Sequence, residues 1–344
     1  MGRKNVTREE IARKAGVSAT VVSWVMNGQA VEKRIAARTI QRVQDTARQL
    51  HYQPNIWGRA LRAQSCGILG FVSANLTDPN ASELIKYLER AARPRGLGLM
   101  LFDLHAYLPM EIGGAPITHL QFCDGFILHV LEDAFLDALK TGVLAHRPFC
   151  VIGKNMQQED VPSVEVDNAS GAEKAIRHLA EIGATRLGII ADDRSQRFTQ
   201  ERLEGCKRAI KELSLTKVQT YWRRPDEDAF TAGVHAVQTW AGSAKMPDAI
   251  FAMGDLIAMG ALNALHEGDI VCPTETAVAG FDDTPFAQYM SPPLTTVAQP
   301  YERMAEATLD MITCLMANKP LAQRHVLIDP ELRVRKSTAR RHMA

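Results

Sequence analysis

From residue 63 onward, short runs of apolar residues alternate with longer segments in which apolar residues recur every three or four positions. The short runs predict buried β-strands, and the longer segments predict amphipathic helices. The predicted strands are 67–72, 97–102, 125–128, 149–152, 163–166, 186–191, 249–253 and 276–279. The predicted helices are 81–93, 131–141, 170–182, 200–213, 229–240 and 256–266. This alternation predicts an α/β protein with doubly wound parallel sheets, divided into two similar lobes. Because ligands of such sheets bind at the carboxyl ends of strands, we expect a binding cleft between the lobes.

The first 62 residues show a different pattern. Thr7 is placed to cap a short helix, with Glu10 as its capping-box partner. Gly16 interrupts this helix, and Ser18 is placed to cap a second one. Two short helices joined by a tight glycine turn predict an N-terminal helix-turn-helix, whose second helix enters the major groove of DNA. An ordinary helical hairpin is the alternative.

Charge distinguishes the same segment from the rest of the chain. Up to residue 62 there are 12 Lys or Arg and 4 Asp or Glu, whereas the whole chain has 40 and 39. A basic segment attached to an acidic remainder predicts a module that binds phosphates, joined to a separate body. The charge pattern therefore favours DNA binding over the simple hairpin.

Length and composition limit the remaining possibilities. A chain of 344 residues is long enough for two or three domains. Its six cysteines form no CxxC motif and no Cys/His pair, so we expect buried thiols in a reducing cytosol and no metal site or cofactor. The sequence shows no secretory signal and no apolar run as long as a membrane helix, so we expect no membrane contact.

Enzyme motifs are missing from the sequence. There is no GxSxG and no P-loop, and Gly96-Leu97-Gly98 lacks the third glycine of a dinucleotide fingerprint. Asp282-Asp283 follow a predicted strand, where carboxylates suit ligand hydrogen bonding or a helix cap better than a metal site. We therefore expect no catalytic residues. An enzyme on this fold with an accessory DNA-binding head remains the alternative.

Blocks along the whole chain resemble one family. The N-terminal blocks are VTREEIARKAGVS, RTIQRVQDTARQLHYQPN and GRALR. The later blocks are VDNASGAEKAIRHLAEIGATRLGII, ERLEGCKRAI, AIFAMGDLIAMGALNAL, VAGFDD and SPPLTTVAQP. Through them the chain resembles the lactose-repressor/galactose-repressor family of bacterial transcription regulators. The resemblance implies a helix-turn-helix head, a hinge helix, and a two-lobed core like that of periplasmic sugar-binding proteins, in which the chain crosses between lobes three times.

The resemblance also implies the domain boundaries and the partners. The expected parts are a DNA-binding domain at 1–54, a hinge at 55–64, and a core at 65–344 with an N-lobe (65–163 and 296–322) and a C-lobe (164–295 and 323–338). It implies a homodimer that binds pseudo-palindromic double-stranded operator DNA. It further implies a cytoplasmic, nucleoid-associated bacterial repressor whose DNA affinity responds to a small-molecule effector in the cleft.

Residues for DNA contact follow from the same resemblance. Ala19 and Thr20 match positions that face bases, and Trp24 lies one helical turn later on the same face. Trp24 stands where Arg or a small polar residue is common, so it either packs against the hinge or touches thymine methyl groups. Val21 stands where the family usually has threonine, so one hydroxyl contact is missing. The positions that match phosphate contacts are Thr7, Ser18, Ser23 and Asn27.

The predicted hinge carries the remaining DNA contacts. Leu61 matches a leucine that wedges into a minor-groove step and kinks the duplex. Arg59 would then contact the adjacent phosphates. Gly58 replaces the usual alanine and weakens the helix propensity of the hinge by roughly 1 kcal/mol, as fits a hinge that folds only on DNA.

The effector positions agree with the family only in part. Arg202 and Asp282 match an arginine and an acid that hold the ligand, and Asn75 matches an aspartate of the first strand–helix loop. Asp255 follows a position that is usually asparagine and is Gly254 here. The usual pairs at two further sites are replaced by Asn80-Ala81 and Gly153-Lys154.

These departures leave several effectors open. We expect a sugar or sugar derivative, with a non-sugar or phosphorylated metabolite and a degraded pocket as alternatives. Lys154 would favour an anionic ligand if it faces the cleft, although it could equally be a solvated surface lysine. Phe198 and Trp222 could supply a stacking surface for the ligand, or they could belong to the core.

Overall fold

The computed structural model describes residues 6–52, 65–104, 120, 122–129, 144, 146–154, 156, 160–243 and 245–339. The chain forms two compact units, Met1–Cys66 and Gly67–Ala344. The predicted hinge at 55–64, with Gly58, Arg59 and Leu61, and the predicted helix at 131–141 lie outside the described residues. No helix in the described part of the chain is long and apolar enough to cross a membrane.

The N-terminal unit contains three helices, α1 (Arg8–Ala15), α2 (Ala19–Met26) and α3 (Ala37–Gln49). The predicted capping box at the start of α1 is confirmed: Thr7 Oγ1 accepts from the Glu10 amide, and Glu10 Oε2 accepts from the Thr7 amide at 2.9 Å. Gly16 ends α1 in the left-handed region, at φ 64°, where glycine has no steric penalty. Ser18 caps α2 by accepting the Val21 amide at 3.2 Å, also as predicted.

Each helix of this unit contributes a fully buried side chain to one small core. Ile11 of α1, Val22 of α2 and Val43 of α3 are all 0 % exposed and belong to the same cluster. Helices of eight residues are too short to be stable alone in water, so this shared core holds them in place.

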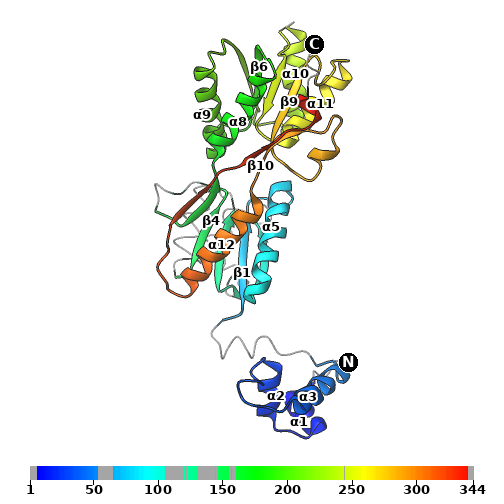
Figure 1. Ribbon diagram of the computed structural model, residues 1–344, viewed down its shortest axis with the longest axis vertical. Coiled ribbons are helices and arrows are strands. Elements are labelled where there is room, and N and C mark those ends of the chain that lie inside the picture. Colours follow the sequence, from blue (N-terminus) through cyan, green and yellow to red (C-terminus); the bar gives the residue numbers. More distant parts are fainter. Residues whose placement is uncertain are drawn as a thin grey trace. The chain divides into compact units, whose positions relative to one another are not determined.

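The second unit contains two six-stranded sheets, one in each lobe (Figure 1). The N-lobe sheet has the order β11-β5-β4-β3-β1-β2 and the C-lobe sheet the order β12-β10-β9-β8-β6-β7. The N-lobe strands are β1 (Ile68–Ser73), β2 (Gly98–Asp103), β3 (Gly125–His129), β4 (Phe149–Ile152), β5 (Ser163–Val166) and β11 (His325–Ile328). The C-lobe strands are β6 (Arg186–Ala191), β7 (Lys217–Trp222), β8 (Ala249–Ala252), β9 (Ala277–Asp282), β10 (Thr295–Ala298) and β12 (Glu331–Arg333). Neighbouring strands are parallel, as predicted, except that β12 pairs antiparallel with β10.

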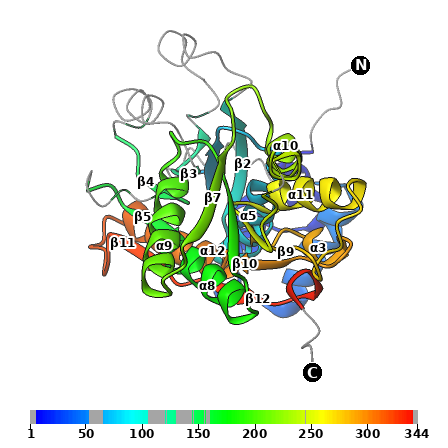
Figure 2. The ribbon, with the colours of Figure 1, turned by 90° about the horizontal axis from the view of Figure 1, so that it is seen from above.

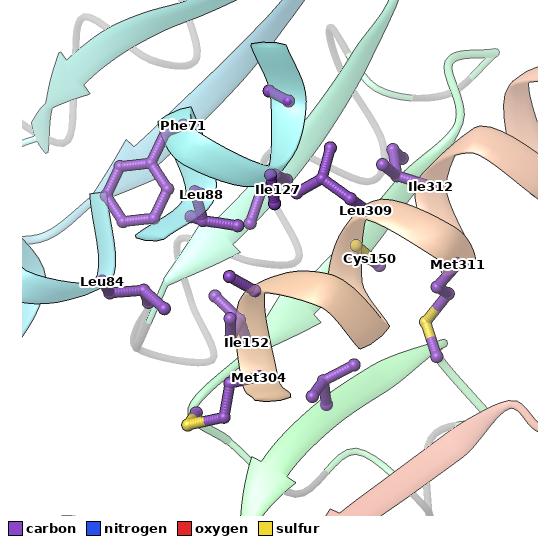
Figure 3. Close-up of a cluster of buried hydrophobic side chains, with 14 of the residues drawn as sticks. Phe71, Leu84, Leu88, Ile127, Cys150, Ile152, Met304, Leu309, Met311 and Ile312 are labelled. Atoms are coloured by element: carbon purple, nitrogen blue, oxygen red, sulfur yellow. The ribbon is translucent and has the colours of Figure 1, made fainter. Parts of the chain in front are cut away.

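Helices cover these sheets. In the N-lobe, α5 (Pro79–Ala92) and α12 (Tyr301–Met316) pack with apolar side chains of β1, β3 and β4, including Phe71, Ile127 and Ile152 (Figure 3). In the C-lobe, α8 (Asn168–Glu181) and α9 (Arg197–Glu212) cover one face, and α10 (Ala229–Gly242) and α11 (Asp255–Glu267) cover the other (Figure 2). Short 3₁₀ helices span Arg93–Arg95, Ala287–Tyr289 and Lys336–Thr338.

The predicted lobe boundaries need correction at three strands. Strand β5 was expected in the C-lobe beyond residue 163 but pairs with β4 and β11 in the N-lobe sheet. Strand β10 was expected in the N-lobe beyond residue 295 but pairs with β9 in the C-lobe sheet, and β11 lies in the N-lobe sheet instead of the C-lobe. The described chain does cross between lobes three times, after β5, after β10 and between β11 and β12. The hydrophobic pattern locates strands but does not tell which of the two sheets a strand joins. A buried strand needs the same apolar residues in either sheet.

Candidate functional site

The residues of α2 that were predicted to meet DNA differ in exposure, and Ala19 and Val21 pack partly against the core of the head. Val22 and Val25 face the core of the head, whereas Thr20 and Asn27 are exposed. The other predicted residues of this helix, Ala19, Val21, Ser23 and Trp24, are half-buried, and the capping residues Thr7 and Ser18 are exposed. The predicted contacts Arg59 and Leu61 lie outside the described residues.

One polar cluster joins α1 to α2. The Ser23 hydroxyl accepts a hydrogen bond from Arg8 Nη1 at 3.3 Å and another from Asn27 Nδ2 at 3.2 Å. Sequence reasoning missed Arg8, which begins α1 fifteen positions before Ser23, because nothing in the local pattern connects the two residues.

A cavity of about 220 Å³ lies between the N-lobe and C-lobe sheets. Carboxyl ends of strands from both sheets border it, as the α/β pattern predicts. Its lining includes Asn75, Asn80, Phe198, Arg202 and Asp282 of the predicted effector positions. Trp222, Asp255 and Lys154 are not on its wall, although Gly254 and Gly153 are.

Arg202 is almost completely buried, with 4 % of its surface exposed. Its Nε donates to Asn168 Oδ1 at 2.9 Å, its Nη1 to the Met253 carbonyl oxygen at 2.6 Å, and its Nη2 to Asp282 Oδ1 at 3.4 Å. The guanidinium also lies over the Phe281 ring, 3.6 Å from the centroid. The protein itself thus uses every nitrogen of this arginine.

Asp282 combines a strained backbone with a fully used carboxylate. Its φ of 117° lies in a region that non-glycine residues rarely adopt, which costs about 1–3 kcal/mol. Oδ1 accepts from Arg202 and from Gln299 Nε2 at 3.2 Å, and Oδ2 accepts from Asn80 Nδ2 at 3.2 Å. Burial raises the pKa of Asp282 although Arg202 opposes this effect. The surrounding hydrogen bonds therefore hold this carboxylate in one orientation at the cavity.

The bond from Asn80 to Asp282 connects the two lobes directly. Asn80 lies in the first turn of α5 in the N-lobe, whereas Asp282 ends β9 in the C-lobe. The Asn80 side chain is itself oriented by Tyr301, whose hydroxyl donates to Asn80 Oδ1 at 2.6 Å. We call this chain of bonds, Tyr301–Asn80–Asp282, the interlobe latch.

Asp255 lies behind the cavity, which corrects the expectation that it contacts an effector. It is 0 % exposed and accepts from the Thr284 amide at 2.7 Å, from Thr284 Oγ1 at 2.8 Å and from Thr296 Oγ1 at 2.6 Å. Burial, with Asp282 close by, raises the pKa of Asp255 to about 7. Its role here is to fix the loop that follows β9.

Ser73 and His129 form a second polar pair on the cavity wall. Ser73 Oγ lies 3.1 Å from His129 Nδ1, and the imidazole stacks on Phe71 with ring centroids 5.6 Å apart. Loss of hydration lowers the pKa of His129 to about 4, so the ring is neutral at neutral pH.

Acidic groups predominate among the ionisable residues on the wall. They include Asp78, Asp192 and Asp282, whereas Arg202 is the one Lys or Arg among the lining residues of the described chain. Asp78 caps α5 by accepting the Asn80 amide at 2.7 Å, and burial raises the pKa of Asp78. Asp192 accepts from Arg223 Nε. The wall therefore offers hydrogen-bond acceptors and little unused positive charge.

Comparisons with known proteins match both the helical N-terminal unit and the two-lobed core. Residues 7–55 match the family described as bacterial regulatory proteins, lacI family, and residues 176–338 match the periplasmic binding protein-like domain. The HTH-type transcriptional repressor PurR of Edwardsiella ictaluri (strain 93-146) is 28% identical over 336 residues, which cover 97% of each chain. The N-terminal unit thus matches the lacI family of bacterial regulatory proteins, and the C-terminal part of the core matches the periplasmic binding protein-like domain.

Solved structures similar to this chain extend over both units. The transcriptional regulator CelR in its cellobiose complex is 25% identical with a TM-score of 0.68, and the similarity covers 97% of this chain and 100% of that one. The lac repressor dimer bound to operator and the anti-inducer ONPF is 22% identical with a TM-score of 0.80, covering 97% and 99%. The latter similarity shows the fold alone.

Sequence reasoning missed several polar residues on the cavity wall, and four of them show which signals the sequence offered. These four are Ser73, His129, Gln299 and Tyr301. A signal for the first two was available, because each is the polar residue directly after a predicted apolar strand. Gln299 and Tyr301 follow β10, a strand that the sequence did not separate from its surroundings.

Proposed function

We propose that this chain is a DNA-binding transcriptional repressor whose affinity for operator DNA is controlled by a small uncharged polar molecule in the interlobe cavity. The observation that carries this proposal is the presence of both parts in one chain: a helix-turn-helix with exposed polar side chains, and a core with a cavity whose wall includes several polar side chains. The chain would act in the bacterial cytoplasm on double-stranded DNA. PurR of Edwardsiella ictaluri is named a repressor, which supports the same function.

The DNA contacts follow the sequence assignment. Ala19, Thr20, Val21 and Trp24 would face base edges, and Thr7, Ser18, Ser23 and Asn27 would contact phosphates. Leu61 and Arg59 would act in the minor groove and on its phosphates. A homodimer would present two heads to a pseudo-palindromic operator, and the lac repressor dimer bound to operator supports this arrangement.

The charge of the cavity wall favours an uncharged effector. Arg202 is already paired with Asp282, and the described wall carries the carboxyl groups of Asp78 and Asp192 but no second Lys or Arg, so a phosphate or carboxylate ligand would find no free cation. Carboxylate, amide and hydroxyl groups on the wall suit a ligand with several hydroxyls. A cavity of about 220 Å³ is smaller than the roughly 300–1,000 Å³ used for drug-sized ligands, so it fits a monosaccharide-sized molecule. These features support a sugar or sugar derivative over a phosphorylated metabolite.

DNA binding is tested by selection of duplexes from a random library with the full chain, followed by fluorescence anisotropy. We expect one enriched pseudo-palindromic sequence, bound about 10³-fold or more tightly than a scrambled duplex. Failure to enrich any sequence at low salt would reject the repressor function.

The effector class is tested by thermal shift of the full chain with neutral sugars and with the corresponding sugar phosphates. A neutral ligand at 100 times its Kd should add about 2.7 kcal/mol to the free energy of unfolding. The shift should disappear in Asp282→Asn and persist in Glu204→Gln, whose side chain is exposed on α9 and off the cavity wall. Stabilisation by sugar phosphates alone would contradict the proposed effector class.

A further inference from the structure

The recognition helix α2 contains no charged residue. Its sequence is ATVVSWVM, from Ala19 to Met26. Sequence-specific proteins most often read guanine with an arginine or lysine that donates to O6 and N7 in the major groove. If this head reads a guanine in that way, the cation must therefore come from another element.

Arg8 of α1 reaches the exposed side of α2. Its Nη1 donates to Ser23 Oγ at 3.3 Å, and the side chain is half-buried instead of extended into solvent. Ser23 is the fourth residue after Ala19 and the third after Thr20, so the three side chains share one helical face. The guanidinium of Arg8 thus lies beside the positions proposed to face bases.

The positive charge of Arg8 is not explained by the stability of its own helix. Arg8 is the first residue of α1, where the helix dipole is positive and an acid would be favoured. In the described part of the chain no carboxylate lies within ion-pair distance of Arg8, although Arg48 of the same unit pairs with Asp45. A guanidinium has five N–H donors, and the hydrogen bond to Ser23 uses one of them.

We propose that Arg8 is a sequence-reading residue, which donates to O6 and N7 of a guanine in each operator half-site while Ser23 holds its guanidinium in place. This inference rests on the DNA-binding function proposed above. It adds to the reading surface a cation that α2 itself lacks. Its contribution would also explain how a helix with Val21 and Trp24 discriminates between sequences.

The test compares three variants of the full chain on the duplex enriched by the wild type, on copies with each guanine of a half-site replaced in turn, and on a scrambled duplex. Arg8→Met should lower affinity for the enriched duplex about tenfold or more and leave affinity for the scrambled duplex nearly unchanged. It should also abolish the penalty for replacing one particular guanine. Arg8→Lys keeps the charge but not the planar fork, so it should retain only part of this discrimination.

Arg13→Met is the matched control. Arg13 lies on the same helix, is exposed, and is five residues from Arg8, on another side of α1. It should change affinity for the enriched and scrambled duplexes by the same small factor. Circular dichroism of each variant checks that the head remains helical.

Two results would overturn the inference. Equal loss of affinity for enriched and scrambled duplexes in Arg8→Met would make Arg8 a phosphate contact. Unchanged discrimination, with or without a lower Tm, would make it a link between α1 and α2 only. If the wild type enriches no duplex at all, the DNA-binding function itself fails, which is a different result from either.

Discussion

His129 should make stability depend on pH in the mildly acidic range. Its pKa is about 4 in the folded chain and about 6.5 in an unfolded one. Between these values the unfolded chain binds a proton that the folded chain does not, so the free energy of unfolding decreases as pH falls from 6.5 towards 4. Because the ring is partly exposed at the cavity wall, we expect a loss of roughly 1–2 kcal/mol by pH 5. Urea unfolding at pH 7 and pH 5 measures it, and His129→Gln should show a smaller loss. An equal loss in both proteins would contradict this assignment.

Glu165 should have the opposite effect, at higher pH. It is 6 % exposed, its Oε2 has no hydrogen-bond partner among the described residues, and burial together with Glu201 raises the pKa of Glu165 to about 8. The folded chain keeps a proton that the unfolded chain releases above about pH 4.5, so stability decreases as pH rises from 4.5 to 8. The glutamine of Glu165→Gln cannot ionise. As pH rises from 5 to 7.5, the free energy of unfolding of this variant should therefore increase by about 3 kcal/mol relative to that of the wild type.

The control for this second effect is Glu204→Gln. Glu204 lies on α9 and is exposed, so the substitution should leave the pH dependence of the free energy of unfolding unchanged. If Glu165→Gln and wild type lose stability in parallel as pH rises, the Glu165 carboxyl is already ionised in the folded chain.

At the scale of elements, the sequence predicts strands that form apolar runs well and strands rich in polar residues, such as β7 and β10, poorly. Strand β6 is buried on both faces from Leu187 onward and is an apolar run after Arg186, and its range of 186–191 was predicted correctly. Strand β7 lies at the sheet edge, alternates with polar residues in KVQTYW and was not predicted. The sequence also assigned β5, β10 and β11 to the wrong sheets. Each of these strands lies next to a point where the chain crosses between lobes, and the predicted crossings were displaced by one strand. Of the cleft, the family resemblance located Arg202 and Asp282 on the wall, whereas Asp255, the first residue of α11, is turned into the protein and Gly254 lines the cavity instead.

Helices α10 and α11 approach each other through two glycines. A Cβ added to Gly260 of α11 would lie 1.9 Å from the Phe230 carbonyl oxygen, and one added to Gly233 of α10 would lie 2.1 Å from the Ile257 carbonyl oxygen. Because both obstacles are backbone atoms, they cannot rotate away, and the helices must separate. Gly260→Ala should therefore destabilise the chain by about 1–3 kcal/mol or more.

Gly242→Ala is the matched control for this packing. Gly242 is the last residue of α10, and an added Cβ there meets no atom within 4 Å. Alanine costs less backbone entropy than glycine in a helix, so this variant should be neutral or gain up to about 1 kcal/mol. Urea unfolding of both variants provides the comparison, and equal stabilities would show that α10 and α11 adjust without cost.

At the scale of the core, its two lobes are connected by three crossings of the chain and by the interlobe latch. The latch places an N-lobe amide on the carboxylate that the proposed effector would also use. Ligand hydroxyls at Asp282 Oδ2 would therefore compete with Asn80. This competition couples occupancy of the cavity to the relative position of the two lobes, as control of DNA affinity by an effector requires.

Asn80→Ala should loosen the interlobe contact without unfolding either lobe. It removes a hydrogen bond to a carboxylate, and bonds of this type contribute about 1.5–3 kcal/mol. We expect faster amide exchange in the first turn of α5 and after β9, and a larger radius of gyration by small-angle scattering. Asn75→Ala is the control, since Asn75 also lines the cavity but, among the described residues, its Oδ1 accepts from Thr77 of its own loop alone, at 2.8 Å from the amide and 2.6 Å from the hydroxyl. If the two variants exchange and scatter alike, the lobes are held together by their crossings alone, and effector control must act through another contact.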